Sequence, residues 1–244
     1  SIKKEIIMTP KLLIIPGLGD SGVGHWQNFW LNHFPNTTKV TQDNWDQPLL
    51  GDWLERLEAT LKTINEPIIL VAHSLATILV AHWAKTFENS YIKGALLVAP
   101  ADVDSPEHTP ECIWNFAPIP LHSLPFPSIV VGSENDPYMT LERAQELAKN
   151  WGSDFINIGK KGHINSEMNL GLWPEGQDIL KLLIQRNHGV VAREDFIYAS
   201  DNIEDDSSLK NIDVIISRIR TKLSKIDEDS SHIKSVRGIG YQLI

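Results

Sequence analysis

Three side chains that together can carry out acyl transfer follow three of the apolar runs in this sequence. Ser74 follows the run IILVA, Asp136 follows SIVVG within SENDPY, and His163 follows FINI within GKKGHIN. A serine hydroxyl is a weak nucleophile, so it needs a histidine base, and the histidine needs a carboxylate to fix its tautomer. The order Ser, Asp, His is typical of this triad on an α/β-hydrolase sheet. We therefore predict that Ser74 is a nucleophile, His163 its base and Asp136 the acid.

Each of these residues also has a simpler interpretation. Ser74 could cap a helix, Asp136 precedes Pro137 and could start a turn, and His163 could be an ordinary loop residue. Their positions at the ends of successive strands favour the catalytic interpretation, because ligands bind at the carboxyl ends of parallel strands. Asp102 also follows an apolar run, so the residues alone leave it as an alternative acid.

The residues around Ser74 predict a sharp turn from a strand into a helix. Their sequence is Ala72-His73-Ser74-Leu75-Ala76, where the usual motif is G-x-S-x-G. Glycines are used because strand and helix approach closely there, and each alanine adds one methyl group. A serine on this turn lies at a helix N-terminus, where the backbone N–H of Leu75 can stabilise a developing oxyanion. We expect Leu75 to be one oxyanion donor.

The elements that must position these residues can be read from the apolar pattern. Runs that are apolar throughout suit strands covered on both faces, and helical patterns separate these runs. The expected fold class is an α/β three-layer sandwich with a mainly parallel sheet. The segment 100–127 contains seven prolines and is expected to be irregular. Strands are expected at 12–15, 68–72, 95–99, 128–131 and 155–158, and helices at 24–33, 50–64, 75–88, 140–151 and 175–186.

Length, net charge and cysteine content argue against several classes of protein. The chain has 244 residues, enough for a main domain with a small appendage. Its net charge of −9 argues against a polyanion-binding protein as a whole. Cys112 is the single cysteine, which indicates a reducing compartment such as the cytoplasm. The apolar run near the N-terminus is too short for a signal peptide or a membrane span, so no membrane partner is expected.

No cofactor or metal is expected. The glycines in PGLGDSGVG lack the Rossmann spacing and a Walker lysine. The nine histidines show no zinc-binding spacing. Trp45, Trp53 and Trp83 are interpreted as packing residues.

Residues 11–186 resemble the small bacterial YdeN-type serine hydrolases, which are related to the retinoblastoma-binding-protein-9 hydrolases. The resemblance implies an α/β-hydrolase with Ser74, Asp136 and His163 as its triad and activity on short acyl esters. It also implies that the N–H of Leu18 is the second oxyanion donor and that His25 and Trp26 lie near the mouth of the site. Ala76 departs from the family, which usually has glycine there. The blocks that carry the resemblance are IPGLGDSGVGHWQNFW, VAHSLATILVAHWA, VVGSENDPYM and GKKGHINSEMNLGLWPEG.

Residues 187–244 have a different character. VAREDFIYAS predicts a short helix, a longer basic helix is expected from about 208, and HIKSVRGIGYQLI predicts a β-hairpin. This order is that of a winged helix-turn-helix. GVVAREDF, IDVIISRIRTKL and IKSVRGIGYQLI resemble the DNA-binding domain of OmpR/PhoB-type response regulators, without that family's N-terminal sheet. The resemblance implies DNA contacts through Lys210, Asn211, Ser217, Arg218, Arg220 and Arg237.

The helix at 175–187 fits both families. EGQDILKLLIQRNHG matches the first helix of the winged-helix domain and also the final hydrolase helix that follows WPEG. We therefore expect a hydrolase domain at 1–186 and a winged-helix domain at 175–244 that share this helix. The tail contains eight Lys and Arg against ten Asp and Glu, so its net charge is −2. DNA binding and a role in packing or dimerisation both remain open for it.

Two functions are consistent with the whole sequence. One is a carboxylesterase that uses a Ser-His-Asp acyl-enzyme mechanism on small acyl esters and carries a winged-helix module for double-stranded DNA. The alternative is a DNA-binding transcriptional regulator whose hydrolase fold senses a small molecule. Labelling by a fluorophosphonate separates the two, because only an activated serine reacts.

Overall fold

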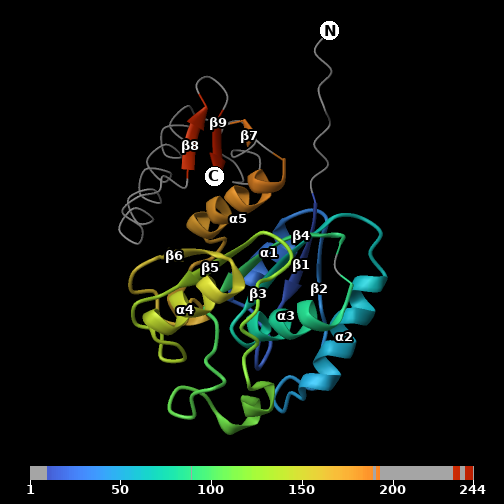
Figure 1. Ribbon diagram of the computed structural model, residues 1–244, viewed down its shortest axis with the longest axis vertical. Coiled ribbons are helices and arrows are strands. Elements are labelled where there is room, and N and C mark those ends of the chain that lie inside the picture. Colours follow the sequence, from blue (N-terminus) through green and yellow to red (C-terminus); the bar gives the residue numbers. More distant parts are fainter. Residues whose placement is uncertain (1–9, 89, 189–190, 193–232, 237–239, 244) are drawn as a thin grey trace.

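The computed structural model of the protein describes residues 10–88, 90–188, 191–192, 233–236 and 240–243, with side chains as far as residue 184. Its main body is a parallel six-stranded sheet in the order β2-β1-β3-β4-β5-β6 (Figure 1). The predicted α/β class is confirmed. The strands are β1 (Lys11–Ile15), β2 (Thr37–Lys39), β3 (Ile68–His73), β4 (Ile92–Val98), β5 (Ser128–Gly132) and β6 (Asp154–Asn157).

Helices cover both faces of this sheet and make two hydrophobic cores. Successive strand residues point to opposite faces, so Leu70 and Ala72 of β3 belong to one core and Ile69 and Val71 to the other. These four side chains are at most 1% exposed, as expected for a strand buried on both faces. One face carries α2 (Leu50–Lys62), α3 (Leu75–Thr86) and α4 (Leu141–Trp151), and the other carries α1 (Trp26–His33) and α5 (Pro174–His188).

Helix α4 begins and ends where its sequence provides caps. The Thr140 side chain accepts a hydrogen bond from the N–H of Arg143 and so starts α4. Gly152 ends this helix with a φ of 69°, a left-handed conformation that suits glycine. Trp53 and Leu57 lie four residues apart and turn one face of α2 into the core.

The structure differs from the sequence-based expectations in one strand and in the bounds of several elements. Strand β2 was not predicted, because its three residues are half-buried at the sheet edge and have no apolar run. Strand β4 begins three residues before the predicted 95, and β6 begins and ends one residue before the predicted 155–158. The proline-rich segment 100–127 is mostly irregular but includes a 3₁₀ helix at Glu111–Phe116.

Helix α5 runs from the carboxyl ends of the strands towards the ends at which the strands begin. It follows the loop after β6, and a Cβ atom at Gly94, near the start of β4, would lie 3.1 Å from the Leu183 side chain. Strand β9 (Gly240–Leu243) lies beside α5 and pairs antiparallel with β7 (Val191–Ala192) and β8 (Ile233–Val236) (Figure 1).

This second sheet agrees with the hairpin predicted within residues 187–244 and differs from the short helix predicted there. Strands β8 and β9 lie within the predicted hairpin and pair with each other. Val191 and Ala192 form a strand where a short helix was expected to begin, because their backbone pairs with Tyr241 and Gly240. The helix expected from about 208 lies outside the described residues.

Candidate active site

Ser74 occupies a strained turn between β3 and α3. Its backbone has a φ of 59° and a ψ of −123°, a conformation that costs a non-glycine residue about 1–3 kcal/mol. The N–H of Ser74 donates to the Val98 carbonyl at 2.9 Å, and its carbonyl accepts from the Thr77 hydroxyl at 2.8 Å. The Ser74 side chain does not cap α3. The turn therefore leaves the hydroxyl available to other groups.

Ser74, His163 and Asp136 come together in one hydrogen-bonded line. The Nε2 of His163 lies 2.8 Å from the Ser74 Oγ, and its Nδ1 lies 3.0 Å from both carboxylate oxygens of Asp136. The side chains of His163 and Asp136 are only 9% and 3% exposed. The N–H of Tyr138 donates to the Asp136 Oδ1 at 2.9 Å and helps to hold the carboxylate. The three residues lie in the loops after β3, β5 and β6.

Asp102, the alternative acid, has a different partner. Its carboxylate lies 3.7 Å from the Nε of Arg143, and its N–H donates to the Tyr138 carbonyl at 3.0 Å. Burial raises the pKa of Asp102, and the nearby Arg143 charge offsets only part of this effect. Asp102 thus anchors the start of the 100–127 segment to α4, and Asp136 is the carboxylate that faces His163.

The loop after β1 lies directly against the turn at Ser74. A Cβ atom at Gly17 would lie 2.9 Å from the His73 carbonyl oxygen and 3.3 Å from the Leu75 nitrogen, so a larger residue would push the loop away. Within the described part of the chain, the N–H groups of Leu18 and Leu75 donate to no other group. Both expected oxyanion donors are therefore on adjacent segments with their hydrogen-bonding capacity unused.

The departure from the G-x-S-x-G motif is accommodated in the core. Ala72 and Ala76 are both 0% exposed and lie in the hydrophobic core beneath the turn. The turn at Ser74 forms with an alanine on each side, so one extra methyl group at each position does not prevent it.

His25 and Trp26, expected near the mouth of the site, are buried beneath its loops. They are 5% and 1% exposed, and Trp26 belongs to the core between α1, α5 and the sheet. The Nδ1 of His25 caps α1 by accepting from the Gln27 N–H at 3.1 Å. The Nε1–H of Trp26 donates to the Ile164 carbonyl at 2.8 Å. Trp26 therefore supports the loop of His163 from below.

Two further residues beneath the site were not singled out from the sequence. The Nε2–H of His73 donates to the His163 carbonyl at 2.9 Å and so joins the Ser74 turn to the loop of the base. The side chain of Gln27 donates to the Ile15 and Val71 carbonyls at 3.2 and 3.0 Å, which ties the ends of β1 and β3 together. In the sequence, only the position of His73 beside Ser74 could have indicated its role. Nothing in the sequence indicated a role for Gln27.

Burial favours the neutral form of the two histidines beneath the site, His25 and His73. The His73 ring lies 4.9 Å from the His163 ring and 4.7 Å from the His25 ring, measured between centroids. Burial lowers the pKa of His73 well below its ordinary value and lowers the pKa of His25 to about 4. A charge that forms on His163 is therefore not opposed by these two neighbours.

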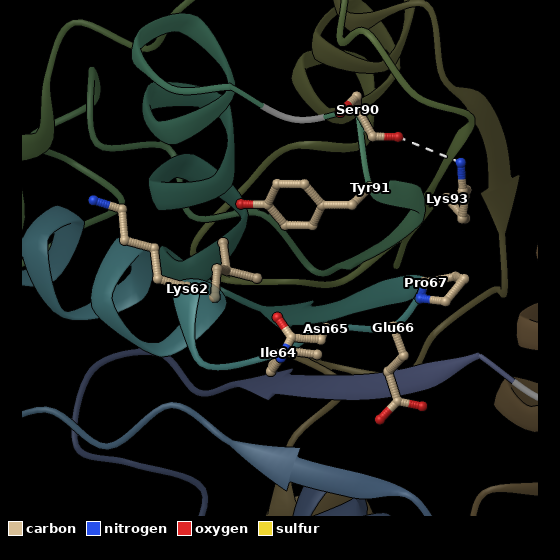
Figure 2. Close-up of a pocket in the computed structure, with 9 residues that line it drawn as sticks. Lys62, Ile64, Asn65, Glu66, Pro67, Ser90, Tyr91 and Lys93 are labelled. Atoms are coloured by element: carbon tan, nitrogen blue, oxygen red, sulfur yellow. Dashed lines mark hydrogen bonds between the residues drawn. The ribbon is translucent and has the colours of Figure 1, made fainter.

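A cleft elsewhere on the molecule does not contain the triad. It has a volume of about 660 Å³ and opens where β3 and β4 begin, at the opposite end of β3 from Ser74 (Figure 2). Lys93 at its rim donates to the Ser90 carbonyl at 3.3 Å (Figure 2). No histidine is among its described lining, which consists of Leu61, Lys62, Ile64, Asn65, Glu66, Pro67, Ser90, Tyr91 and Lys93.

The described residues contain neither a cluster of candidate metal ligands nor a helix suited to a membrane. No group of three or more His, Cys, Asp and Glu side chains gathers there in a way that could hold a metal ion. None of the helices in this part of the chain combines the length and the apolarity that a membrane span requires.

The fold and the strained serine at the carboxyl end of β3 define an α/β-hydrolase. The chain belongs to the serine hydrolase family, whose model matches residues 12–182. A second family model, the C-terminal domain of transcriptional regulatory proteins, matches residues 167–243. By this match the end of the chain is a winged-helix domain of the OmpR/PhoB type. The predicted membership of both families is confirmed. Lys210, Asn211, Ser217, Arg218, Arg220 and Arg237, expected to contact DNA, lie outside the described residues.

Solved structures support the assignment of the first domain. A YdeN-like hydrolase from Pectobacterium atrosepticum is 32% identical, with a TM-score of 0.62 over 71% of this chain and 89% of that one. The ydeN gene product of B. subtilis is 19% identical, with a TM-score of 0.61 over 72% of this chain and 100% of that one. Est1E from Butyrivibrio proteoclasticus is 14% identical, with a TM-score of 0.55 over 72% and 88%, and shares the fold. No curated protein matches the chain.

Proposed function

We propose that the protein is a carboxylesterase that hydrolyses small acyl esters through an acyl-enzyme. The observation that carries this proposal is the continuous line from the Ser74 Oγ to the His163 Nε2 at 2.8 Å and on to Asp136 at 3.0 Å. A serine in this arrangement is activated by its base, and the base is oriented by the carboxylate.

In the acylation step, the Ser74 Oγ attacks the ester carbonyl carbon and His163 Nε2 accepts the hydroxyl proton. The N–H groups of Leu75 and Leu18 stabilise the oxyanion of the tetrahedral intermediate. His163 then gives its proton to the alcohol oxygen, the carbon–oxygen bond of the ester breaks, and the alcohol leaves.

In the deacylation step, His163 removes a proton from water and the hydroxide attacks the acyl-enzyme carbonyl. The second tetrahedral intermediate collapses, His163 returns the proton to the Ser74 oxygen, and the carboxylic acid leaves. Asp136 keeps the Nδ1 proton of His163 in place throughout. The unused N–H groups beside the strained turn support this sequence of steps.

Two measurements test the proposal. The purified full chain is incubated with a fluorescent fluorophosphonate, and hydrolysis is measured for a series of esters from acetate to octanoate. We expect covalent labelling at Ser74 and the highest kcat/KM for the short acyl groups. A wild-type chain that is not labelled and hydrolyses no ester would contradict the proposal.

A second function is favoured by the match of residues 167–243 to a transcriptional regulatory domain. In this alternative, the protein binds double-stranded DNA through Lys210, Asn211, Ser217, Arg218 and Arg220, with Arg237 in the minor groove, and the first domain acts as a small-molecule sensor. A gel shift with random duplex DNA at low and high salt tests for binding. DNA retention without fluorophosphonate labelling would favour the sensor, and both together would indicate a DNA-binding esterase.

We also propose that α5 belongs to both domains. The two family matches overlap over residues 167–182, and the first two turns of α5 lie inside this overlap. The single cysteine, Cys112, is consistent with a cytoplasmic location for such a protein.

A further inference from the structure

Tyr138 is held in an exposed position beside the base. Its ring centroid lies 4.4 Å from that of His163, and the residue is 38% exposed. Its N–H donates to Asp136 at 2.9 Å and its carbonyl accepts from the Asp102 N–H at 3.0 Å. Since both the N–H and the carbonyl of Tyr138 are bonded to buried residues, the backbone that carries the ring is fixed beside the base.

The proton transfers of the reaction determine which part of a substrate lies near this ring. His163 Nε2 must reach the alcohol oxygen in order to protonate it, so the alcohol part of the ester lies next to the His163 imidazole. The acyl carbonyl oxygen instead points to the N–H groups of Leu18 and Leu75. The Tyr138 ring, packed against the imidazole, is therefore close to where this alcohol group would lie.

We propose that Tyr138 forms a wall of the leaving-group subsite and favours esters of aryl or arylalkyl alcohols. A planar aromatic group beside Tyr138 gains an offset or edge-to-face contact with its ring, which a small alkyl alcohol cannot make. This proposal rests on the proposed esterase function. It names the class of alcohol that the same site selects.

A purely structural role is the rival explanation. The ring could shield the hydrogen bond between His163 and Asp136 from water, and its loss would then slow the hydrolysis of every ester by the same factor. The two roles are separated by comparing two substrates that form the same acyl-enzyme, because deacylation is then identical.

The experiment measures kcat/KM for ethyl acetate and benzyl acetate with the wild type and with Tyr138→Ala and Tyr138→Phe. We expect Tyr138→Ala to lower the benzyl-to-ethyl ratio of kcat/KM about fivefold to tenfold, the size of one lost aromatic contact. Tyr138→Phe retains the ring and keeps the wild-type ratio. Phe29→Ala is the matched control, because it removes another exposed ring, 41% exposed, from α1.

Each outcome has a separate meaning. A Tyr138→Ala ratio equal to that of the wild type, with both rates lowered together, would overturn the subsite in favour of shielding. A ratio that rises would show that the ring obstructs aromatic alcohols and would also overturn it. If the wild type itself is not labelled by a fluorophosphonate, the proposed function fails instead. Circular dichroism melting of each variant checks that the fold is retained.

Discussion

At the scale of single residues, the role of each aspartate near the site depends on the side chain that its carboxylate faces. Two aspartates lie close to the end of the central strands, and each is engaged by one base or cation. Asp136 faces His163, whereas Asp102 faces Arg143. Residue type alone could not separate these roles, because both aspartates follow apolar runs. The partner of each carboxylate makes its role testable.

The first prediction concerns Ser74. Ser74→Ala should lower kcat by about 10⁴-fold or more and abolish fluorophosphonate labelling, because only the attacking oxygen is removed. The melting temperature should stay close to that of the wild type, since the Ser74 side chain does not cap α3. Turnover close to wild type in a folded Ser74→Ala variant would exclude the serine mechanism.

The second prediction compares the two aspartates. Asp136→Asn should reduce kcat by roughly 10⁴-fold, because an amide no longer holds His163 in the tautomer that accepts the serine proton. Asp102→Asn is the matched control and should change kcat only a few-fold, since its partner is Arg143. Steady-state kinetics with a short-chain ester measures both. The reverse order of the two effects would mean that the triad is assembled differently.

At the scale of elements, buried hydrogen bonds join the turn of Ser74, the loop of His163 and helix α1. His73 bonds to the His163 carbonyl, Trp26 bonds to the Ile164 carbonyl, and His25 caps α1 while its ring lies against His73. These bonds hold the base at a set distance from the nucleophile, although none of the three residues touches the reacting atoms.

The third prediction concerns His73. His73→Leu should lower kcat while leaving KM nearly unchanged, because the loop of His163 loses a tie and the base moves relative to Ser74. His73→Gln can still donate a hydrogen bond to the carbonyl and should recover much of the lost activity. Kinetics with a short-chain ester gives both values, and the NMR signal of the proton between His163 and Asp136 reports on the base directly. Equal activity of the Leu and Gln variants would argue against this role of the hydrogen bond.

The fourth prediction concerns pH and His25. Burial lowers the pKa of His25 from 6.5 to about 4, so between these values the unfolded chain binds more protons than the folded one. Proton binding by the unfolded chain therefore lowers the free energy of unfolding as the pH falls below about 6.5. The loss due to His25 is about 2 kcal/mol at pH 5. His25→Asn retains a side chain that can cap α1 and removes the titrating group.

The measurement is urea unfolding of the wild type and His25→Asn at pH 7.5 and pH 5. Burial raises the pKa of Asp178 to about 6, which acts in the opposite direction over the same range. The effect of His25 is therefore read from the difference between the two proteins. His33→Asn, an exposed change on the same helix, is the control. An equal loss of stability in wild type and His25→Asn would contradict the prediction.

At the scale of the whole molecule, α5 connects the two family matches. Its start lies at the carboxyl ends of the strands, where the side chain of Gln177 donates to the Leu172 carbonyl at 2.7 Å, and β9 lies beside the helix. Fifteen helical residues span about 22 Å, so the β7-β9-β8 sheet lies well away from Ser74.

The fifth prediction concerns the connection between the domains. If α5 serves both, limited proteolysis should cut in the acidic segment 200–208 or near the termini before it cuts at 184–190, because a packed helix resists cleavage. Mass spectrometry of the early fragments gives the order of the cuts. Rapid cleavage at 184–190 that releases an intact first domain would indicate two tethered domains.

The sequence by itself determined five strands of the main sheet and the helices between them, the loops that carry Ser74, Asp136 and His163, and both family memberships. Strands buried on two faces must be apolar throughout, so five of the six strands of the main sheet are visible as local patterns. The ends of parallel strands meet at one edge, which makes their loops recognisable as a site from the order of the chain.

Only the tertiary structure decided what lies next to these loops. It placed His25 and Trp26 beneath the site, the Tyr138 ring 4.4 Å from that of His163, and Arg143 on Asp102. It also added the edge strand β2, which has no apolar run. These contacts join residues far apart in the chain or at its turns. They depend on how the loops and layers pack together, and the local periodicity of a sequence carries no record of that packing.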